Sequence, residues 1–327
     1  MRFHRLFALG VLALAVAGIC TSLPALAAEE HFDRTLQVSG PVELEVQTGS
    51  GSISIRTGNS STVHISGTVR SSGDWFGGSD ADKKVHYLAT NPPIEQMGSV
   101  IKIGHIEDEA LQHNVSISYE IVTPAATRLR SSSGSGDQDA RGIAGPVEAS
   151  SGSGSLHLTE IGDMVRASTG SGQINLDGVK GSVHASTGSG EITATGVAGG
   201  LHASTGSGNV TLRQTAPGDV QVNTGSGSVR LDGVHGSVRA STASGDIRVE
   251  GEGEGSWRLS TASGSVSVNL PSRQGFTLHA QTVSGGIHTA REMTVQGELG
   301  GHRLEGKVGD GGFLLDVSTV SGSINIQ

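Results

Sequence analysis

Cysteine, aromatic residues and positive charge are all scarce in this sequence. Cys20 is the single cysteine, and it lies in the N-terminal segment that we expect to be removed. The mature chain would then form no disulfide and no zinc site of the cysteine type. The 327 residues include two Trp, two Tyr and six Phe, so a hydrophobic core has to be built mainly from aliphatic side chains.

The net charge argues against one large class of function. It is −9 at pH 7 with histidine neutral, and removal of Arg2 and Arg5 with the N-terminal segment would take it to −11. A chain this acidic is not a general nucleic-acid binder. We therefore expect no nucleic-acid partner.

Residues 1–28 have the pattern of a signal peptide. Arg2 and Arg5 form a positive n-region, an apolar h-region follows, and Ala25-Leu26-Ala27 is a cleavage signal. Processing as a lipoprotein at Cys20 is the alternative, but Ile19 is larger than the residue that such processing requires. No later stretch is apolar enough to cross a bilayer. The sequence predicts export to the periplasm, the cell surface or the medium, with no transmembrane segment in the mature chain.

Glycine, by contrast, is abundant and periodic. There are 51 glycines, and the pentapeptide Ser-Thr-Gly-Ser-Gly or a near copy recurs along the chain. Its last glycine falls at Gly136, Gly154, Gly172, Gly190, Gly208, Gly227, Gly245, Gly264, Gly285 and Gly322. The first eight steps are 18 to 21 residues long, and the last step, of 37 residues, is interpreted as two units, one of them degenerate.

Within each unit, apolar and polar residues alternate. In the unit Ser182–Gly199, Val183 and Ala185 form one alternating run, and Ile192 and Ala194 form a second run nine residues later. Such runs predict two half-buried strands of about five residues, separated by glycine turns. We expect the glycines to supply positive φ angles at these turns.

Stacked units of this kind predict an all-β, single-stranded parallel β-solenoid. Each turn of about 18 residues, here called a rung, would be a two-sided coil, and the preference of crossover connections favours the right hand. A three-sided hexapeptide helix would need aliphatic residues at Val183, Ser189 and Thr195, and it is rejected because the last two are polar. The predicted inward columns are Ala167, Ala185, Ala203 and Ala240 beside Val165, Val183, Leu201, Val220 and Val238, with Trp257 as a local filler.

The chain is predicted to have two regions after the signal peptide. Residues 29–127 form an irregular N-terminal β segment with a short helical insertion at 71–97, and residues 128–327 form regular repeats of 18–19 residues. The helix is expected at Asp80–Leu88, and the irregular segment is expected to cap the solenoid. Trp75 and Phe76 could pack on the core or form an exposed contact loop.

Three features together resemble a known family. They are the repeated Thr-Gly-Ser-Gly-x-Ile-x-Leu units, the segment Tyr119–Pro124 and the closing segment Ser318–Ile326. They are similar to those of the bacterial putative-adhesin proteins, which are exported β-strand-repeat proteins carrying a domain of unknown function. The resemblance implies a repetitive β fold and an adhesin-like role, and it brings no catalytic residues.

The enzymatic alternative is a carbohydrate-active β-helix enzyme acting on an envelope or extracellular polysaccharide. Such enzymes use clustered carboxylates on one face. Asp137 and Asp139 would share a face, but the equivalent residues of the next rung are Ser155 and His157. We therefore expect no catalytic residue, no cofactor and no metal site, since His184 and His202 alone are too few ligands.

One outward column is mostly basic in this acidic chain. It contains Arg130, Glu148, Arg166, His184, His202, Gln221, Arg239, Arg258 and His279, with Asp316 near the end. The residues Gln173, Glu191, Asn209 and Asp246 are expected on the opposite face. We interpret Arg130, Arg166, His184, His202, Arg239 and Arg258 as a stripe for an anionic polymer, against the alternative of an ordinary solvated sheet face.

The sequence therefore predicts a non-catalytic, exported, adhesin-like solenoid in the cell envelope. Its expected partners are an anionic envelope polysaccharide or another envelope protein. Self-association edge to edge is also expected, through an unpaired last strand at Ile324-Asn325-Ile326.

Overall fold

The computed structural model describes residues 28–58, 61–71, 78–106, 108, 111, 113–295 and 301–327. The predicted signal peptide lies outside these residues except for Ala28, and so do Trp75 and Phe76. Among the described residues, no helix is long and apolar enough to span a membrane. The predicted division at residues 127 and 128 stays a prediction.

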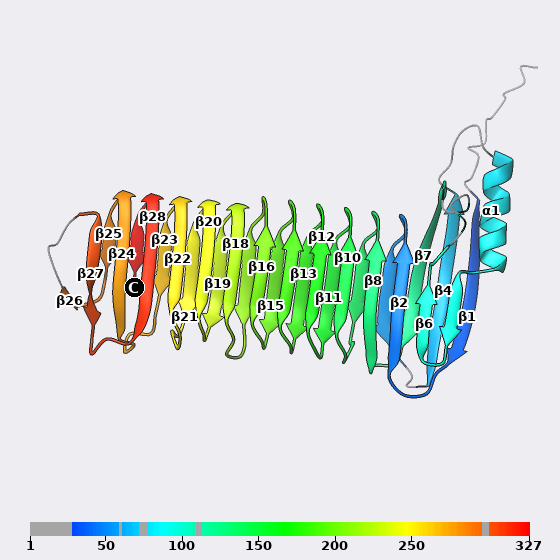
Figure 1. Ribbon diagram of the computed structural model, residues 1–327, viewed down its shortest axis with the longest axis horizontal. Coiled ribbons are helices and arrows are strands. Elements are labelled where there is room, and N and C mark those ends of the chain that lie inside the picture. Colours follow the sequence, from blue (N-terminus) through cyan, green and yellow to red (C-terminus); the bar gives the residue numbers. More distant parts are fainter. Residues whose placement is uncertain are drawn as a thin grey trace, which may run out of the picture.

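The molecule is a long rod made of two facing sheets (Figure 1). Sheet A contains, in spatial order, β1 (Glu29–Gln37), β4 (Thr62–Ser71), β7 (Val115–Thr123), β3 (Ile53–Thr57), β9 (Gln138–Arg141), β11 (Leu156–Ile161), β13 (Ile174–Val179), β15 (Ile192–Val197), β17 (Val210–Gln214), β19 (Val229–Val234), β21 (Ile247–Gly251), β23 (Val266–Asn269), β29 (Ile324–Ile326) and β25 (Ile287–Thr289).

Sheet B lies opposite and runs the whole length of the rod. It contains β26 (Met293–Val295), β27 (Arg303–Val308), β24 (Phe276–Ser284), β28 (Phe313–Ser321), β22 (Trp257–Ser263), β20 (Val238–Ser244), β18 (Val220–Ser226), β16 (Leu201–Thr205), β14 (Val183–Thr187), β12 (Val165–Thr169), β10 (Val147–Ser151), β8 (Thr127–Ser133), β2 (Val42–Thr48), β6 (Val100–Ile103) and β5 (Ile94–Met97). The predicted two-sided parallel solenoid is confirmed.

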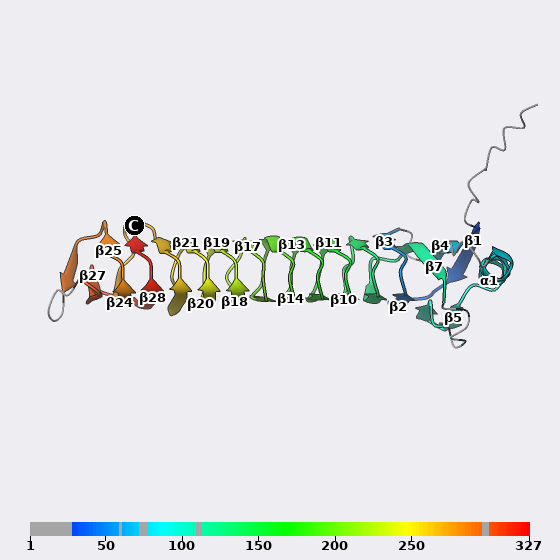
Figure 2. The ribbon, with the colours of Figure 1, turned by 90° about the horizontal axis from the view of Figure 1, so that it is seen from above.

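The coil is right-handed, as expected. Figure 2 places sheet B on the side that faces the viewer in Figure 1, with sheet A behind it. In Figure 1 the sheet B strands of the regular rungs point up and those of sheet A point down, while the chain advances from right to left.

Parallel pairing is in register from rung to rung, so like residues stack. Val165 pairs with Val183, and Val183 pairs with Leu201, each one rung apart. All the predicted inward columns are buried, and Trp257 is fully buried with its Nε1 donating to the Gly236 carbonyl at 2.8 Å. Each sheet thus contributes more than one inward column to the core, such as those of Val183 and Ala185 in sheet B, and Trp257 fills the core locally.

The recurring threonine–glycine corner forms a buried ladder of hydrogen bonds. The Thr187 hydroxyl donates to the Gly172 carbonyl of the preceding rung at 3.0 Å, and it accepts the Gly190 N–H of its own turn at 3.0 Å. A Cβ on Gly190 would lie 1.8 Å from that same Gly172 carbonyl oxygen. Glycine is therefore required at this corner by close approach of the backbone.

Positive φ angles occur at both kinds of corner, as expected. At the threonine–glycine corner, φ lies between 146° and 155° at Gly245, Gly264, Gly285 and Gly322. Gly178, Gly196 and Gly233 have φ of 68°, 66° and 69° after their sheet A strands. Glu160 occupies the position equivalent to Gly178 in the preceding rung, and its φ is 57°. An L-residue in this region carries a steric cost of roughly 1–2 kcal/mol.

The order of the strands departs from the sequence at the C-terminal end. β28 lies between β22 and β24, and β29 lies between β23 and β25. The Thr319 hydroxyl donates to Gly264 and the Thr282 hydroxyl donates to Gly322, so the corner ladder follows the spatial order. The expected unpaired last strand is wrong, because β29 is paired on both of its edges.

The N-terminal end shows the same arrangement. β2 and β3 form a rung, and this rung lies between β6–β7 and β8–β9. β4, which starts one residue before Val63, adds no further rung of parallel strands, because it pairs antiparallel with both β7 and β1. Antiparallel strands and α1 (Gly78–Thr90) cover this end, while antiparallel β26 and β27 cover the sheet B edge at the other end.

We predict that rungs can be removed one at a time. Deleting Gln173–Gly190 takes out one rung and rejoins equivalent corners, so it lowers the thermal midpoint by only a few degrees. Deleting Gln173–Gly181 joins non-equivalent strands and abolishes the cooperative transition. Melting curves from circular dichroism check this, and similar curves for the two deletions would contradict the two-sided coil.

A second prediction concerns the left-handed residue Glu160. Glu160→Gly relieves the backbone strain and raises the free energy of unfolding by about 0.5–1 kcal/mol. Its lost ion pair with Arg141, at 3.8 Å and exposed on both sides, offsets only a few tenths of this. The matched change Gly178→Glu lowers stability by about 1–2 kcal/mol. Urea denaturation measures both, and a destabilised Glu160→Gly variant would refute the assignment.

Tyr119 predicts a loss of stability in alkaline solution. Its side chain is 1% exposed, the described residues offer its hydroxyl no hydrogen-bond partner, and burial raises its pKa. Above about pH 10 the unfolded chain releases the phenolic proton while the folded chain retains it, so the free energy of unfolding falls as pH rises. Tyr119→Phe flattens this alkaline limb in pH-dependent denaturation, whereas Tyr87→Phe, at a 52% exposed site, leaves it unchanged.

Candidate ligand-binding face

The outward column predicted from the sequence exists on the outer face of sheet B. Strand pairing aligns its members one above another, and we call them the middle row: Arg130, Glu148, Arg166, His184, His202, Gln221, Arg239, Arg258, Asp316 and His279. The spatial order differs from the predicted one, since Asp316 lies between Arg258 and His279.

The six predicted stripe residues are not equivalent. Arg130 is 3.5 Å from Glu148, and Arg258 is 3.1 Å from Asp316, so both of these guanidinium groups are neutralised locally. Arg166 and Arg239 are exposed and form no salt bridge with a carboxylate among the described residues. Of the four arginines in the middle row, these two are available to a ligand.

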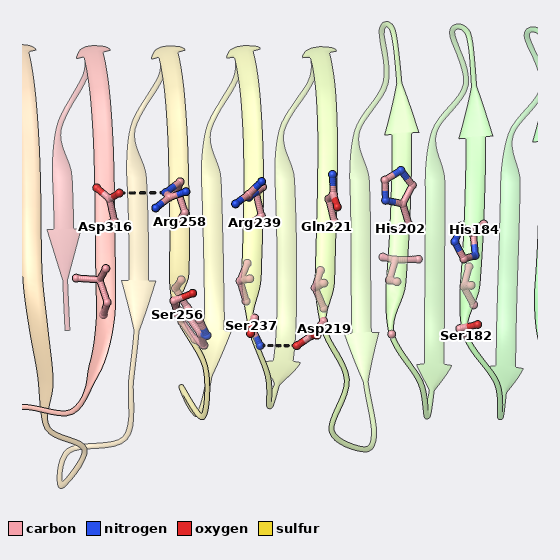
Figure 3. A pocket seen from close by; sticks show the side chains of 17 residues that line it. Ser182, His184, His202, Asp219, Gln221, Ser237, Arg239, Ser256, Arg258 and Asp316 are labelled. Carbon is pink, nitrogen blue, oxygen red and sulfur yellow. Dashed lines mark hydrogen bonds and ion pairs between the residues drawn. The ribbon is translucent and has the colours of Figure 1, made fainter.

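Between the two arginines the row presents planar polar groups. The His184 and His202 rings lie side by side on neighbouring strands, with centroids 5.7 Å apart and planes tilted by 31°. Gln221 follows on the next strand, as Figure 3 shows. The row therefore combines cationic, aromatic and amide groups at single-strand spacing.

Two further outward rows border the middle row. Residues two positions later form the serine row, which includes Ser150, Ser168, Ser186 and Ser204. Residues two positions earlier form the turn row, which includes Ser182, Asp219, Ser237 and Ser256 (Figure 3). Both flanking rows are hydroxyl-rich, and Asp219 adds a carboxylate whose Oδ1 accepts the Ser237 N–H at 3.0 Å.

Shallow grooves run along these rows. The largest, about 360 Å³, lies between the middle row and the turn row from His184 to Asp316. A second, about 290 Å³, lies between the middle row and the serine row from Glu148 to His202. A third, about 60 Å³, continues past Arg166 towards Arg128 and Arg130. Neighbouring grooves share lining residues of the middle row, so together they follow this row along the rod.

The turn row was missed in the sequence analysis. Its signal was present, because each member lies two residues before a middle-row residue in the same 18- to 19-residue period. The residues expected on the opposite face lie instead at the corner before the sheet A strands. There Asn209 Oδ1 accepts the Ser228 N–H and Asp246 Oδ1 accepts the Ser265 N–H, at 2.9 and 2.8 Å.

The carboxylates weighed for catalysis occupy the other side of the rod. Asp137 Oδ1 accepts the Ser155 N–H at 2.8 Å, and Asp139 pairs in sheet A with Ser54 and His157. The described residues contain no group of three or more His, Cys, Asp or Glu side chains arranged to hold a metal ion. The sheet B face presents guanidinium, imidazole, amide and hydroxyl groups, which can form hydrogen bonds with anions and with hydroxyl groups.

Part of the chain matches a known family model. Residues 180–327 match the family model described as Toastrack DUF4097. The predicted resemblance to proteins that carry a domain of unknown function is confirmed over this part. Among curated proteins no match is found.

Two solved structures align over most of the chain. One is described as a putative cell adhesion protein from Clostridium sporogenes, with 13% identity, a TM-score of 0.19, and coverage of 91% of this chain and 99% of the other. The second is described as a putative adhesin from Bacteroides fragilis, with 9% identity, a TM-score of 0.33, and coverage of 91% and 97%. A TM-score below 0.5 does not indicate a common overall fold.

Proposed function

With residues 180–327 similar to the Toastrack DUF4097 family, we propose that this protein is a non-catalytic, adhesin-like solenoid of the cell envelope that binds an anionic polymer on sheet B. The series of grooves along the middle row carries this proposal. It runs parallel to the rod axis, so it suits an extended chain better than a small compact ligand.

The arrangement of charge supports an anionic polymer. The two unpaired arginines of the middle row, Arg166 and Arg239, line these grooves in a protein whose net charge is −9. Each exposed charge contact contributes at most about 1 kcal/mol and is screened by salt. A polymer that spans several rungs gains from simultaneous contacts, so binding should strengthen with chain length.

The positions of the carboxylates favour binding over hydrolysis. Asp219, which directly precedes β18, and Asp316 on β28 both line the groove of about 360 Å³, and the two strands are three spacings apart, roughly 14 Å. Paired glycosidase carboxylates are about 5–9.5 Å apart. The alternative of a carbohydrate-active enzyme gains no support from these two residues. Export and an envelope location rest on the predicted signal peptide.

The test compares two charge-matched double variants. Arg166→Ser/Arg239→Ser removes the two unpaired arginines of the middle row on sheet B, and Arg213→Ser/Arg248→Ser removes two exposed arginines from sheet A. We expect the first to weaken binding of polygalacturonate at low salt by roughly five- to thirtyfold, which is one to two charge contacts. The second should bind like the parent protein.

Isothermal titration calorimetry at two salt concentrations supplies the measurement, with neutral dextran as the control polymer. Equal binding by the two double variants, or no binding by the parent protein, would contradict the proposal and show that the sheet B face is an ordinary solvated surface.

A further inference from the structure

The middle row is interrupted by acids on both sides of its central part. Glu148 precedes Arg166, and Asp316 follows Arg258 in space. Six residues on neighbouring strands lie between these acids, from Arg166 to Arg258. An anionic chain that extended past either end would meet a carboxylate, so the face suits a segment of limited length.

The two larger grooves lie on opposite sides of the middle row. The groove that includes Arg166 borders the serine row, and the groove that includes Arg239 borders the turn row. His184 and His202 line both grooves. A chain that occupies both grooves therefore crosses the middle row over the imidazole pair, where Figure 3 shows the two rings on adjacent strands.

The flanking rows define the chemistry of that chain. Serine hydroxyls accept and donate hydrogen bonds, and the exposed Asp219 carboxylate only accepts them. A uniformly anionic polymer such as polyphosphate offers Asp219 no donor and repels it. A polymer of sugar acids offers hydroxyl donors to Asp219 and the serines, carboxylates to the arginines, and ring faces to the imidazoles.

We infer that sheet B binds a finite stretch of carboxylate-bearing polysaccharide that crosses from the serine row to the turn row over His184 and His202. Its carboxylates are held by Arg166 and Arg239, which are four strand spacings apart, about 19 Å. This inference rests on the proposed function and adds the ligand class, its path and the spacing of its charges.

The spacing is tested with two deletions that each remove one rung. Deleting Gln173–Gly190 together with Gln221→His shortens the arginine spacing to three strands and keeps two neighbouring imidazoles between them. Deleting Asp137–Gly154 leaves the spacing unchanged and removes Glu148. Circular dichroism confirms that both are folded, and the point variant Arg239→Gln tests the same contact without a deletion.

Size-fractionated oligogalacturonates are the probe, with neutral malto-oligosaccharides and inorganic polyphosphate for comparison. For the parent protein, affinity should rise with oligomer length and level off once the oligomer spans Arg166 to Arg239. The shortened site and Arg239→Gln should each lose about fivefold on oligomers of that length. The deletion that keeps the spacing should bind them like the parent, and longer oligomers more tightly.

The outcomes separate this inference from the proposed function. Equal affinity of both deletions and the parent for oligogalacturonates would overturn the spacing, while the anion-binding function would stand. Polyphosphate binding as tight as that of oligogalacturonate would overturn the ligand class alone. If the parent protein binds no anionic polymer, the proposed function fails and this inference fails with it.

Discussion

The close approach of successive glycine corners is the constraint on which the rest of this structure depends. The Gly172 carbonyl oxygen occupies the space where a Cβ on Gly190 would stand, and the Thr187 hydroxyl joins the two corners. The same contact recurs along the rod, as between Thr242 and Gly227. A rung that slipped by one residue would lose this hydrogen bond and turn its apolar side chains outward. Register is therefore held at the corner as well as in the core.

In-register stacking turns every outward position into a row, and this is how the candidate site arises. A single arginine in one rung is an ordinary solvated side chain. Placed one strand spacing from histidine, glutamine and arginine on its neighbours, it becomes part of an extended face along the rod. In such a fold, a substitution at one outward position of each rung changes the chemistry of a whole row, while the backbone stays the same. The same regularity explains why Glu148 and Asp316 can delimit the face, since each neutralises the arginine beside it.

The two ends of the rod have to be covered. An open rung exposes apolar core and unpaired strand edges, which invites association with other chains. Here the first and last rungs in the sequence each lie one place inside the stack, and antiparallel segments continue the sheets beyond them. At both ends, segments of the chain itself therefore cover the terminal rungs. Phe32 and Tyr119, with ring centroids 6.4 Å apart, add aromatic packing where the N-terminal strands meet the stack.

The all-β class, the two-sided rung, the inward columns and the basic middle row could all be predicted from the sequence. They follow from local periodicity: an alternation of two within strands and a repeat of 18–19 residues between them. Only the tertiary structure decided which rungs are neighbours, because the order Trp257, Leu315, Leu278 in sheet B joins residues far apart in the chain. It alone paired Arg258 with Asp316, left Arg166 and Arg239 available, and exposed the grooves. The repeat determines which side chains each rung places outward and inward. It does not determine which rungs are neighbours at the ends, because the rungs have nearly the same corner sequence, and there strand pairing decides the order.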